Sequence, residues 1–468
     1  MSELDRRLIQ IRPSPRQLAL QEREFYAFVH FTVNTFTDRE WGDGTEDPGI
    51  FNPARFDASQ WVSAVRAAGM KGLILTCKHH DGFCLWPSRY TRHSVAASPF
   101  RRDVVGEVAA ACREGGIGFG VYLSPWDRNH PLYGTGKAYD DYFIAQLTEL
   151  LTGYGEIFAV WFDGACGEGP NGRKQHYDWE RYYAVIRELQ PGACIHVCGP
   201  DVRWCGNEAG DTRESEWSVV PRRTADTEKV ASASQQADDT QFRQRIIRAQ
   251  DRDLGSRSVL ADEEELIWYP AEVNTSIRPG WFWHADEDDR LRPLEKLIDI
   301  YEKSVGGNAT FLLNIPPTRE GLFHENDVKR LQEFGDYLAR SYGHNLAEEA
   351  EITASAAKEG HDACCLCRED GDCYIPAAED GTAEILLRWE APRRIRRVVL
   401  REQISLSQRV ERFCVETLTP WGWQPAASGT VIGSKRILVL DAPETTALRI
   451  RITDARVAPT LRFIGVYA

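Results

Sequence analysis

Short apolar runs alternate with amphipathic stretches between residues 24 and 317, and this alternation constrains the fold more than any other feature. The apolar runs lie at 24–31, 72–80, 118–125, 156–164, 193–199, 266–272 and 308–317. Stretches with helical spacing lie at 57–69, 102–116, 141–155, 177–191, 293–307 and 326–343. This order predicts parallel strands with helices outside them, and the continuous apolar character indicates strands buried on both faces. We therefore predict an α/β fold, a (β/α)8-like TIM barrel, although only six or seven strands are evident.

The pattern changes beyond residue 345 to short segments that alternate apolar and polar residues. They lie at 383–391, 396–404, 411–419, 435–442, 447–455 and 461–468, which is typical of a half-buried antiparallel β-sandwich. A chain of 468 residues is also too long for one ordinary core. We predict two domains, a catalytic barrel over 1–345 and a C-terminal β-sandwich over 346–468. The polar stretch 219–264 is interpreted as a surface insertion with one helix near 241–250.

Charge and composition restrict the partners. A net charge of −14 argues against nucleic acid and anionic membranes, which both require a basic surface. No apolar run approaches the length of a membrane span. The polar segment 1–17 lacks the apolar core of a secretory signal, and twelve scattered cysteines fit a reducing compartment, so a cytoplasmic location is expected. A neutral ligand such as a sugar remains compatible, and the oligomeric state is left open.

Polar and aromatic residues stand where the predicted strands end. His30 ends the first strand, His79 and His80 end the second, Trp126 follows the third, and Asp163 ends the fourth. The active site of a parallel α/β barrel lies at the carboxyl ends of its strands, so these side chains should share one mouth. Aromatic rings pack on the apolar faces of sugars, while imidazoles and carboxylates pair with hydroxyls. The set therefore favours a sugar pocket.

Carboxylates are the candidates for chemistry. Asp163 follows the apolar stretch IFAVWF and precedes Gly164, so it can serve as a catalytic group or merely cap the next helix. A retaining glycosidase needs a second carboxyl about 5 to 5.5 Å from the first. Glu208, Glu214 and Glu216 are candidates, although for each acid taken singly a solvated acidic loop is the more common case. Sequence spacing does not select among them.

Several motifs taken together resemble one enzyme family. They are HFT at 30–32, EWG at 40–42, KHHDGF at 78–83, LSPWDRN at 123–129, WFDG at 161–164, NEAG at 207–210, SIRPGWFWH at 276–284 and the stretch 306–335. As a set they are similar to the α-L-fucosidases of glycoside hydrolase family 29, over nearly all of the barrel. The forms LSPWDRN, GNEAG and SIRPGWFWH resemble the branch that prefers α-1,3 and α-1,4 linkages on Lewis-type glycans. The cysteine-dense stretch 361–373 departs from the family pattern.

The resemblance implies a retaining exo-α-L-fucosidase that acts on fucosylated oligosaccharides without metal or cofactor. By this resemblance, Asp163 is the nucleophile and Glu208 is the acid/base. The family's sugar-binding positions fall on His30, Glu40, Trp41, His79, His80, Trp126 and Trp281. The histidines would hold fucose hydroxyls, Trp126 would lie near the nucleophile, and Trp281 would wall the side of the C5-methyl group.

Two other functions remain as alternatives. The first is a catalytically inactive fucose-binding protein, which is disfavoured because both candidate carboxylates are present. The second is a metal-dependent barrel hydrolase, because His79 and His80 are neighbours. Adjacent residues of a strand point to opposite sides, so they can ligate one ion only if the strand has already ended. In the sandwich, Trp421 and Trp423 are a candidate sugar platform, although we favour a structural role for this domain.

Overall fold

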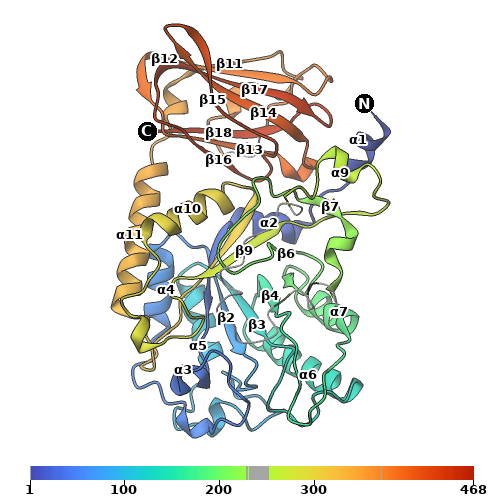
Figure 1. Ribbon diagram of the computed structural model, residues 1–468, viewed down its shortest axis with the longest axis vertical. Coiled ribbons are helices and arrows are strands. Elements are labelled where there is room, and N and C mark those ends of the chain that lie inside the picture. Colours follow the sequence, from blue (N-terminus) through green and yellow to red (C-terminus); the bar gives the residue numbers. More distant parts are fainter. Residues whose placement is uncertain (1, 228–229, 231–233, 235–251, 370–371) are drawn as a thin grey trace.

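The computed structural model describes residues 2–227, 230, 234, 252–369 and 372–468. In Figure 1 a barrel occupies the lower part of the molecule and a sheet-rich domain the upper part. The helix predicted near 241–250 lies outside the described residues. Within the described parts of the chain, no helix has both the length and the apolar character needed to cross a bilayer.

Eight parallel strands form a nearly closed barrel, which confirms the predicted fold. In spatial order they are β5 (Cys194–Val197), β4 (Ala159–Phe162), β3 (Gly118–Leu123), β2 (Gly72–Lys78), β1 (Phe25–Val29), β10 (Ala309–Asn314), β9 (Ala271–Ser276) and β6 (Arg203–Trp204). The two ends of this order approach each other at a single bridge between His196 and Val202. The carboxyl ends of the eight strands therefore surround one opening.

Helices follow most of the strands and cover the barrel. They are α4 (Ala58–Ala67), α5 (Val104–Glu114), α6 (Lys137–Gly153), α7 (Trp179–Leu189), α10 (Leu294–Ser304) and α11 (Glu325–Tyr342). Aspartates begin three of them by accepting backbone N–H bonds: Asp57 before α4, Asp103 before α5 and Asp178 before α7. The apolar faces of the helices pack on strands that are buried along almost their whole length.

Two details of the predicted barrel were wrong. Only the last two residues of the run 266–272 belong to a barrel strand: β8 (Leu266–Trp268) pairs antiparallel with β7 (Val219–Pro221), and the barrel strand β9 begins at Ala271. Most of β9 lies beyond the predicted run because its buried residues include Glu272, Asn274 and Ser276, which break the apolar pattern. The eighth strand, β6, has only two residues and follows β5 without a helix, so it has no sequence signature.

The C-terminal part folds into two antiparallel sheets. One has the order β11 (Glu351–Ala354), β12 (Ala383–Arg394), β17 (Glu444–Ala455), β14 (Val410–Thr419) and β15 (Gly422–Gly429); the other has β16 (Arg436–Val439), β13 (Arg397–Glu402) and β18 (Leu461–Tyr467). Their apolar residues form a core of their own. This confirms the predicted β-sandwich. The division at residue 345 stays a prediction; α11 ends at Tyr342 and β11 begins at Glu351.

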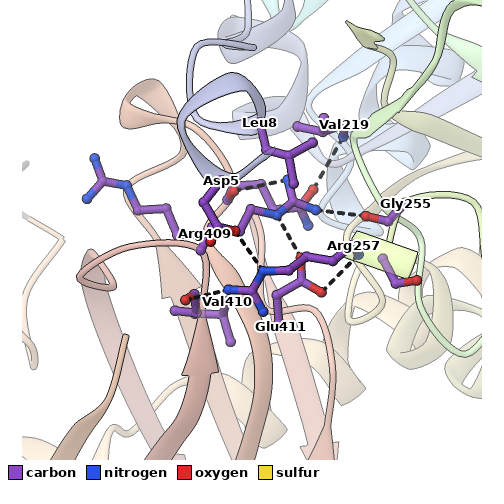
Figure 2. Close-up of polar contacts among 12 residues, drawn as sticks. Asp5, Leu8, Val219, Gly255, Arg257, Arg409, Val410 and Glu411 are labelled. Atoms are coloured by element: carbon purple, nitrogen blue, oxygen red, sulfur yellow. Dashed lines mark hydrogen bonds and ion pairs between the residues drawn. The ribbon is translucent and has the colours of Figure 1, made fainter. Parts of the chain in front are cut away.

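Charged residues join the two parts near the N-terminus. Figure 2 shows Arg257, the first residue of α9 (Arg257–Leu260), close to Asp5 of α1 (Glu3–Leu8) and Glu411 of β14. The Arg257 guanidinium binds Asp5 at 2.7 Å and Asp454 of β17 at 2.8 Å. Leu8 packs beside this ion-pair cluster in a small apolar core that includes Ile404 of the sandwich. The sandwich is thus tied to the barrel by both apolar and ionic contacts.

Candidate active site

A pocket opens at the carboxyl ends of the barrel strands. It encloses about 590 Å³ of space, part of which is open to solvent. Eight of the nine predicted site residues line it: His30, Glu40, Trp41, His79, His80, Asp163, Glu208 and Trp281. Phe28, Trp161, Val197, Trp204 and Asn274 complete much of the wall. The strand-end positions identified from the sequence therefore do meet in one place.

Asp163 stands just beyond β4 and is held at both carboxylate oxygens. Its Oδ1 accepts the Ala165 backbone N–H at 2.8 Å, and its Oδ2 accepts the Tyr122 hydroxyl at 2.9 Å. Burial raises the pKa of Asp163 above the usual value, while these two donors act in the opposite direction. The side chain keeps 23% of its surface exposed, so a ligand in the pocket can reach it.

His80 presents a hydrogen-bond acceptor beside Asp163. The Ser124 hydroxyl donates to the Trp126 carbonyl at 2.7 Å, so its oxygen is left to accept from His80 Nδ1, also at 2.7 Å. Burial, with nearby positive groups, lowers the pKa of His80 to about 3, so the ring is neutral and carries its proton on Nδ1. Nε2 therefore holds a lone pair, 3.8 Å from Asp163 Oδ2. A ligand hydroxyl is suited to this position because it can donate to Nε2.

The same reasoning assigns the proton of His30. The Asn314 amide nitrogen donates to Ser276 Oγ and to the Trp281 carbonyl, so its oxygen faces His30 Nδ1 at 2.8 Å and must accept. Burial lowers the pKa of His30 to about 4, which makes this ring neutral as well. Its Nε2 is a second acceptor. Two neutral imidazoles oriented in this way match the hydroxyl groups of a sugar.

His79 bears on the question of a metal. β2 ends at Lys78, so His79 and His80 both lie beyond the strand, and their ring centroids are only 4.1 Å apart. The strand has therefore ended before the two histidines, which is the condition under which both rings can face one ion. Ligand atoms of His79, His80 and Asp163 all lie within 4.8 Å of one another, a spacing that fits a transition-metal ion. The geometry alone leaves both a sugar and a metal compatible with this corner of the pocket.

The three candidate glutamates have different surroundings. Glu208 lines the pocket, and its Oε2 accepts the indole N–H of Trp281 at 3.0 Å. Glu216 is fully buried and pairs with Arg203 at 2.6 Å and Arg213 at 3.2 Å, and these cations hold its pKa below the usual value despite burial. Glu214 lines a separate cavity between the barrel and the sandwich. Only Glu208 of the three is placed to act in this pocket.

Glu40 has most of its hydrogen-bonding capacity engaged by the chain. Its Oε2 accepts the backbone N–H of Trp281 at 2.9 Å, and its Oε1 accepts that of Phe282 at 3.1 Å. His284 Nε2 approaches the same Oε1 at 2.8 Å. Glu40 thus lines the pocket and also fixes the turn that carries Trp281.

Trp126 is the one predicted site residue that is not among the lining residues. Its ring packs behind the pocket wall, at centroid distances of 4.9 Å from His80 and 5.4 Å from Trp41. Its indole N–H donates to the Glu168 carbonyl at 3.1 Å. Trp126 therefore supports the residues that face the cavity.

Several polar residues around the pocket were not identified from the sequence. Tyr122 lies inside β3 and contacts Asp163, and Asn314 ends β10 and orients His30. Asn314 could have been found, because a polar residue follows FLL at a strand end. Tyr122 and the Trp204–Asn274 pair, joined at 3.0 Å, sit within strands and carry no such signal.

Val197 adds a strained backbone to the pocket wall. It lies at the end of β5 with φ of 63°, a left-handed conformation that is unfavourable for a β-branched residue. Strain of this kind costs on the order of 1–3 kcal/mol and concentrates at functional sites. Its position beside Asp163 in the pocket wall agrees with that tendency.

Comparison with known proteins points to one family. A family model described as alpha-L-fucosidase matches residues 21–343. Alpha-L-fucosidase 1 of Arabidopsis thaliana is 41% identical over 471 residues, covering 97% of this chain and 87% of the relative.

Solved structures agree. A putative alpha-L-fucosidase from Bacteroides ovatus has a TM-score of 0.84 and 43% identity, covering all of this chain and 76% of that one. A glycoside hydrolase family 29 fucosidase from Ruminococcus gnavus, solved in complex with fucose, has a TM-score of 0.83 and 28% identity, covering 98% and 95% of the two chains.

Proposed function

The chain belongs to the alpha-L-fucosidase family of glycoside hydrolases, and we propose that it is a retaining exo-enzyme that removes terminal α-1,3- or α-1,4-linked fucose from oligosaccharides. The observation that carries this proposal is the shared pocket: Asp163 and Glu208 line the same cavity, together with two neutral imidazoles whose acceptors suit sugar hydroxyls. The family's solved complex with fucose supports the sugar.

The reaction proceeds in two displacements. The Asp163 carboxylate attacks the anomeric carbon while the bond to the leaving oxygen breaks, and protonated Glu208 gives its proton to that oxygen. In the second step Glu208, now a carboxylate, takes a proton from water as the water oxygen bonds to the anomeric carbon and Asp163 leaves. The configuration at this carbon is inverted twice and therefore retained.

The linkage preference rests on sequence motifs. LSPWDRN at 123–129, GNEAG at 206–210 and SIRPGWFWH at 276–284 resemble the branch acting on α-1,3 and α-1,4 linkages. The second of these contributes Glu208 and the third contributes Trp281, and the two side chains are hydrogen-bonded in the pocket. Because Glu208 would protonate the leaving oxygen, this contact supports the proposal that residues of these two motifs distinguish the aglycone.

One experiment tests the chemistry. Wild type, Asp163→Ala and Glu208→Ala are incubated with nitrophenyl fucoside and with a Lewis-type trisaccharide, and an α-1,2-linked trisaccharide serves as the linkage control. Asp163→Ala should abolish both reactions. Glu208→Ala should lose the trisaccharide far more than the aryl substrate, because a good leaving group needs no proton, and azide should rescue the aryl reaction. Full trisaccharide activity in Glu208→Ala would reject the acid/base assignment.

Retention and the metal alternative have their own assays. Proton NMR should show the α-anomer of fucose as the first product, and initial release of the β-anomer would contradict a retaining mechanism. A metal-dependent hydrolase is the second candidate because of the group His79, His80 and Asp163. Our proposal predicts full activity after prolonged chelation with EDTA and dialysis. A loss that Zn²⁺ or another divalent ion restores would favour the metal-dependent alternative.

A further inference from the structure

The turn that carries Trp281 is held at three points. The backbone N–H of Trp281 donates to Glu40 Oε2 at 2.9 Å, and the Trp281 carbonyl accepts from the Asn314 amide at 2.8 Å. The indole N–H of the same residue donates to Glu208 Oε2 at 3.0 Å. The first two contacts fix the backbone and the third fixes a carboxylate oxygen of Glu208. The orientation of Glu208 therefore depends on where this turn lies.

His284 anchors the turn from outside the pocket. Its Nε2 lies 2.8 Å from Glu40 Oε1, and its Nδ1 lies 2.8 Å from Asp38 Oδ1. Ionised carboxylate oxygens only accept hydrogen bonds, so both ring nitrogens must carry a proton and the ring is an imidazolium. The Glu40 contact is the largest cause of a pKa raised to about 9, and Glu287 acts in the same direction. The positive ring thus holds Glu40 in the orientation that binds the turn.

We propose that His284 is a positioning residue, which acts on Glu208 through Glu40 and the Trp281 turn. This inference rests on the function proposed above. His284 is not among the residues that line the pocket, so it is placed to influence the acid/base without touching the sugar. Without His284, the half-buried Glu40 carboxylate would lose its counter-ion and turn toward water. The Trp281 indole N–H would then no longer hold the Glu208 carboxyl group in the position from which it protonates the leaving oxygen.

The expected signature is selective. A general acid matters for a poor leaving group, whereas a nitrophenyl fucoside needs no proton in its first step. A displacement of about 1 Å costs on the order of 100-fold in rate. His284→Ala should therefore lower kcat/KM for the Lewis-type trisaccharide by roughly 10- to 100-fold and leave kcat/KM for the aryl fucoside within about threefold. Azide should restore its aryl kcat, as it should for Glu208→Ala.

A double-mutant cycle tests the route of action. In a Glu208→Ala background, His284→Ala should cause no further loss of aryl kcat, because the group on which it acts is already absent. His284→Gln retains one donor toward Glu40 and should recover most of the trisaccharide activity. His344→Ala is the matched control, since His344 forms a comparable 2.7 Å pair with Glu349 but is 73% exposed. It should behave as wild type.

Two results would overturn the proposal. Equal losses on both substrates would indicate a general structural role or a direct effect of Glu40 on the sugar. A loss that persists in the Glu208→Ala background would show that His284 does not act through Glu208. Thermal unfolding of each variant checks folding, and His284→Gln carries the test if His284→Ala does not fold. Full trisaccharide hydrolysis by Glu208→Ala alone would instead reject the acid/base assignment on which this inference rests, whatever His284 does, and a wild type that releases no fucose would refute the proposed function itself.

Discussion

The Tyr122 hydroxyl should set the lower pH limit of activity, because it donates to the proposed nucleophile at 2.9 Å. Tyr122→Phe removes this donor and little else. The ring is buried and stacks on Trp161 with centroids 5.4 Å apart, and a phenylalanine ring preserves that packing. The Ala165 backbone N–H remains on the other oxygen of Asp163.

The expected shift follows from the energy of one hydrogen bond. A bond to a charged group contributes about 1.5–3 kcal/mol, which corresponds to about one to two pH units at 1.36 kcal/mol per unit. Asp163 is 23% exposed, so water can replace part of the lost bond and the lower end is expected. The donor favours the ionised form, so its loss adds to the effect of burial and raises the pKa of Asp163 further.

The assay is the pH dependence of kcat/KM for nitrophenyl fucoside. Because Asp163 must be ionised to attack, Tyr122→Phe should lose activity at a higher pH than wild type as the pH falls, by about one unit. Tyr374→Phe is the matched control: Tyr374 is buried and donates at 2.9 Å to the Ser355 carbonyl in the C-terminal part of the chain. If a folded Tyr122→Phe variant loses activity at the same low pH as wild type, the reasoning is refuted.

Three further outcomes are expected. Glu216→Gln should destabilise the protein by about 3 kcal/mol in urea unfolding, because it removes the negative charge that pairs with the buried Arg203 guanidinium; unchanged stability would contradict this account. Arg257→Ala should lower the Tm by several degrees through loss of its contacts to Asp454 and neighbouring groups, and an unaltered Tm would show that this junction is not stabilising. Because the pKa of His284 is raised to about 9, its imidazolium stabilises the folded state fully below about pH 6.5, and this stabilisation is lost as the pH rises through 9. The stabilisation amounts to at most about 3 kcal/mol. In His284→Ala the free energy of unfolding should therefore differ less between pH 6 and pH 10 than it does in wild type. An unchanged difference would contradict a protonated His284 in the folded protein.

Local patterns in the sequence are sufficient for the architecture and for half of the site. Buried parallel strands are continuously apolar, helix starts carry Asp57, Asp103 and Asp178, and a parallel barrel brings all strand ends to one side. For that reason the sequence alone predicted that His30 and Asp163 lie at the same opening of the barrel. Each of these inferences uses a residue and its near neighbours in the chain, where spacing and structure are directly linked.

The remaining features depend on contacts between residues far apart in the chain. Glu208 differs from Glu214 and Glu216 only in what surrounds it, and those surroundings come from Trp281 and the buried arginines. The strand at 271–276 carries polar side chains because the barrel interior supplies their partners, as Trp161 and His196 do for Glu272. Sequence by itself determined the fold class, the strand-end residues and the family resemblance. The family resemblance had already favoured Glu208, but only the tertiary structure decided what surrounds each of the three glutamates and which groups hold Glu208 in the pocket of Asp163, because segments far apart in the chain meet at that point.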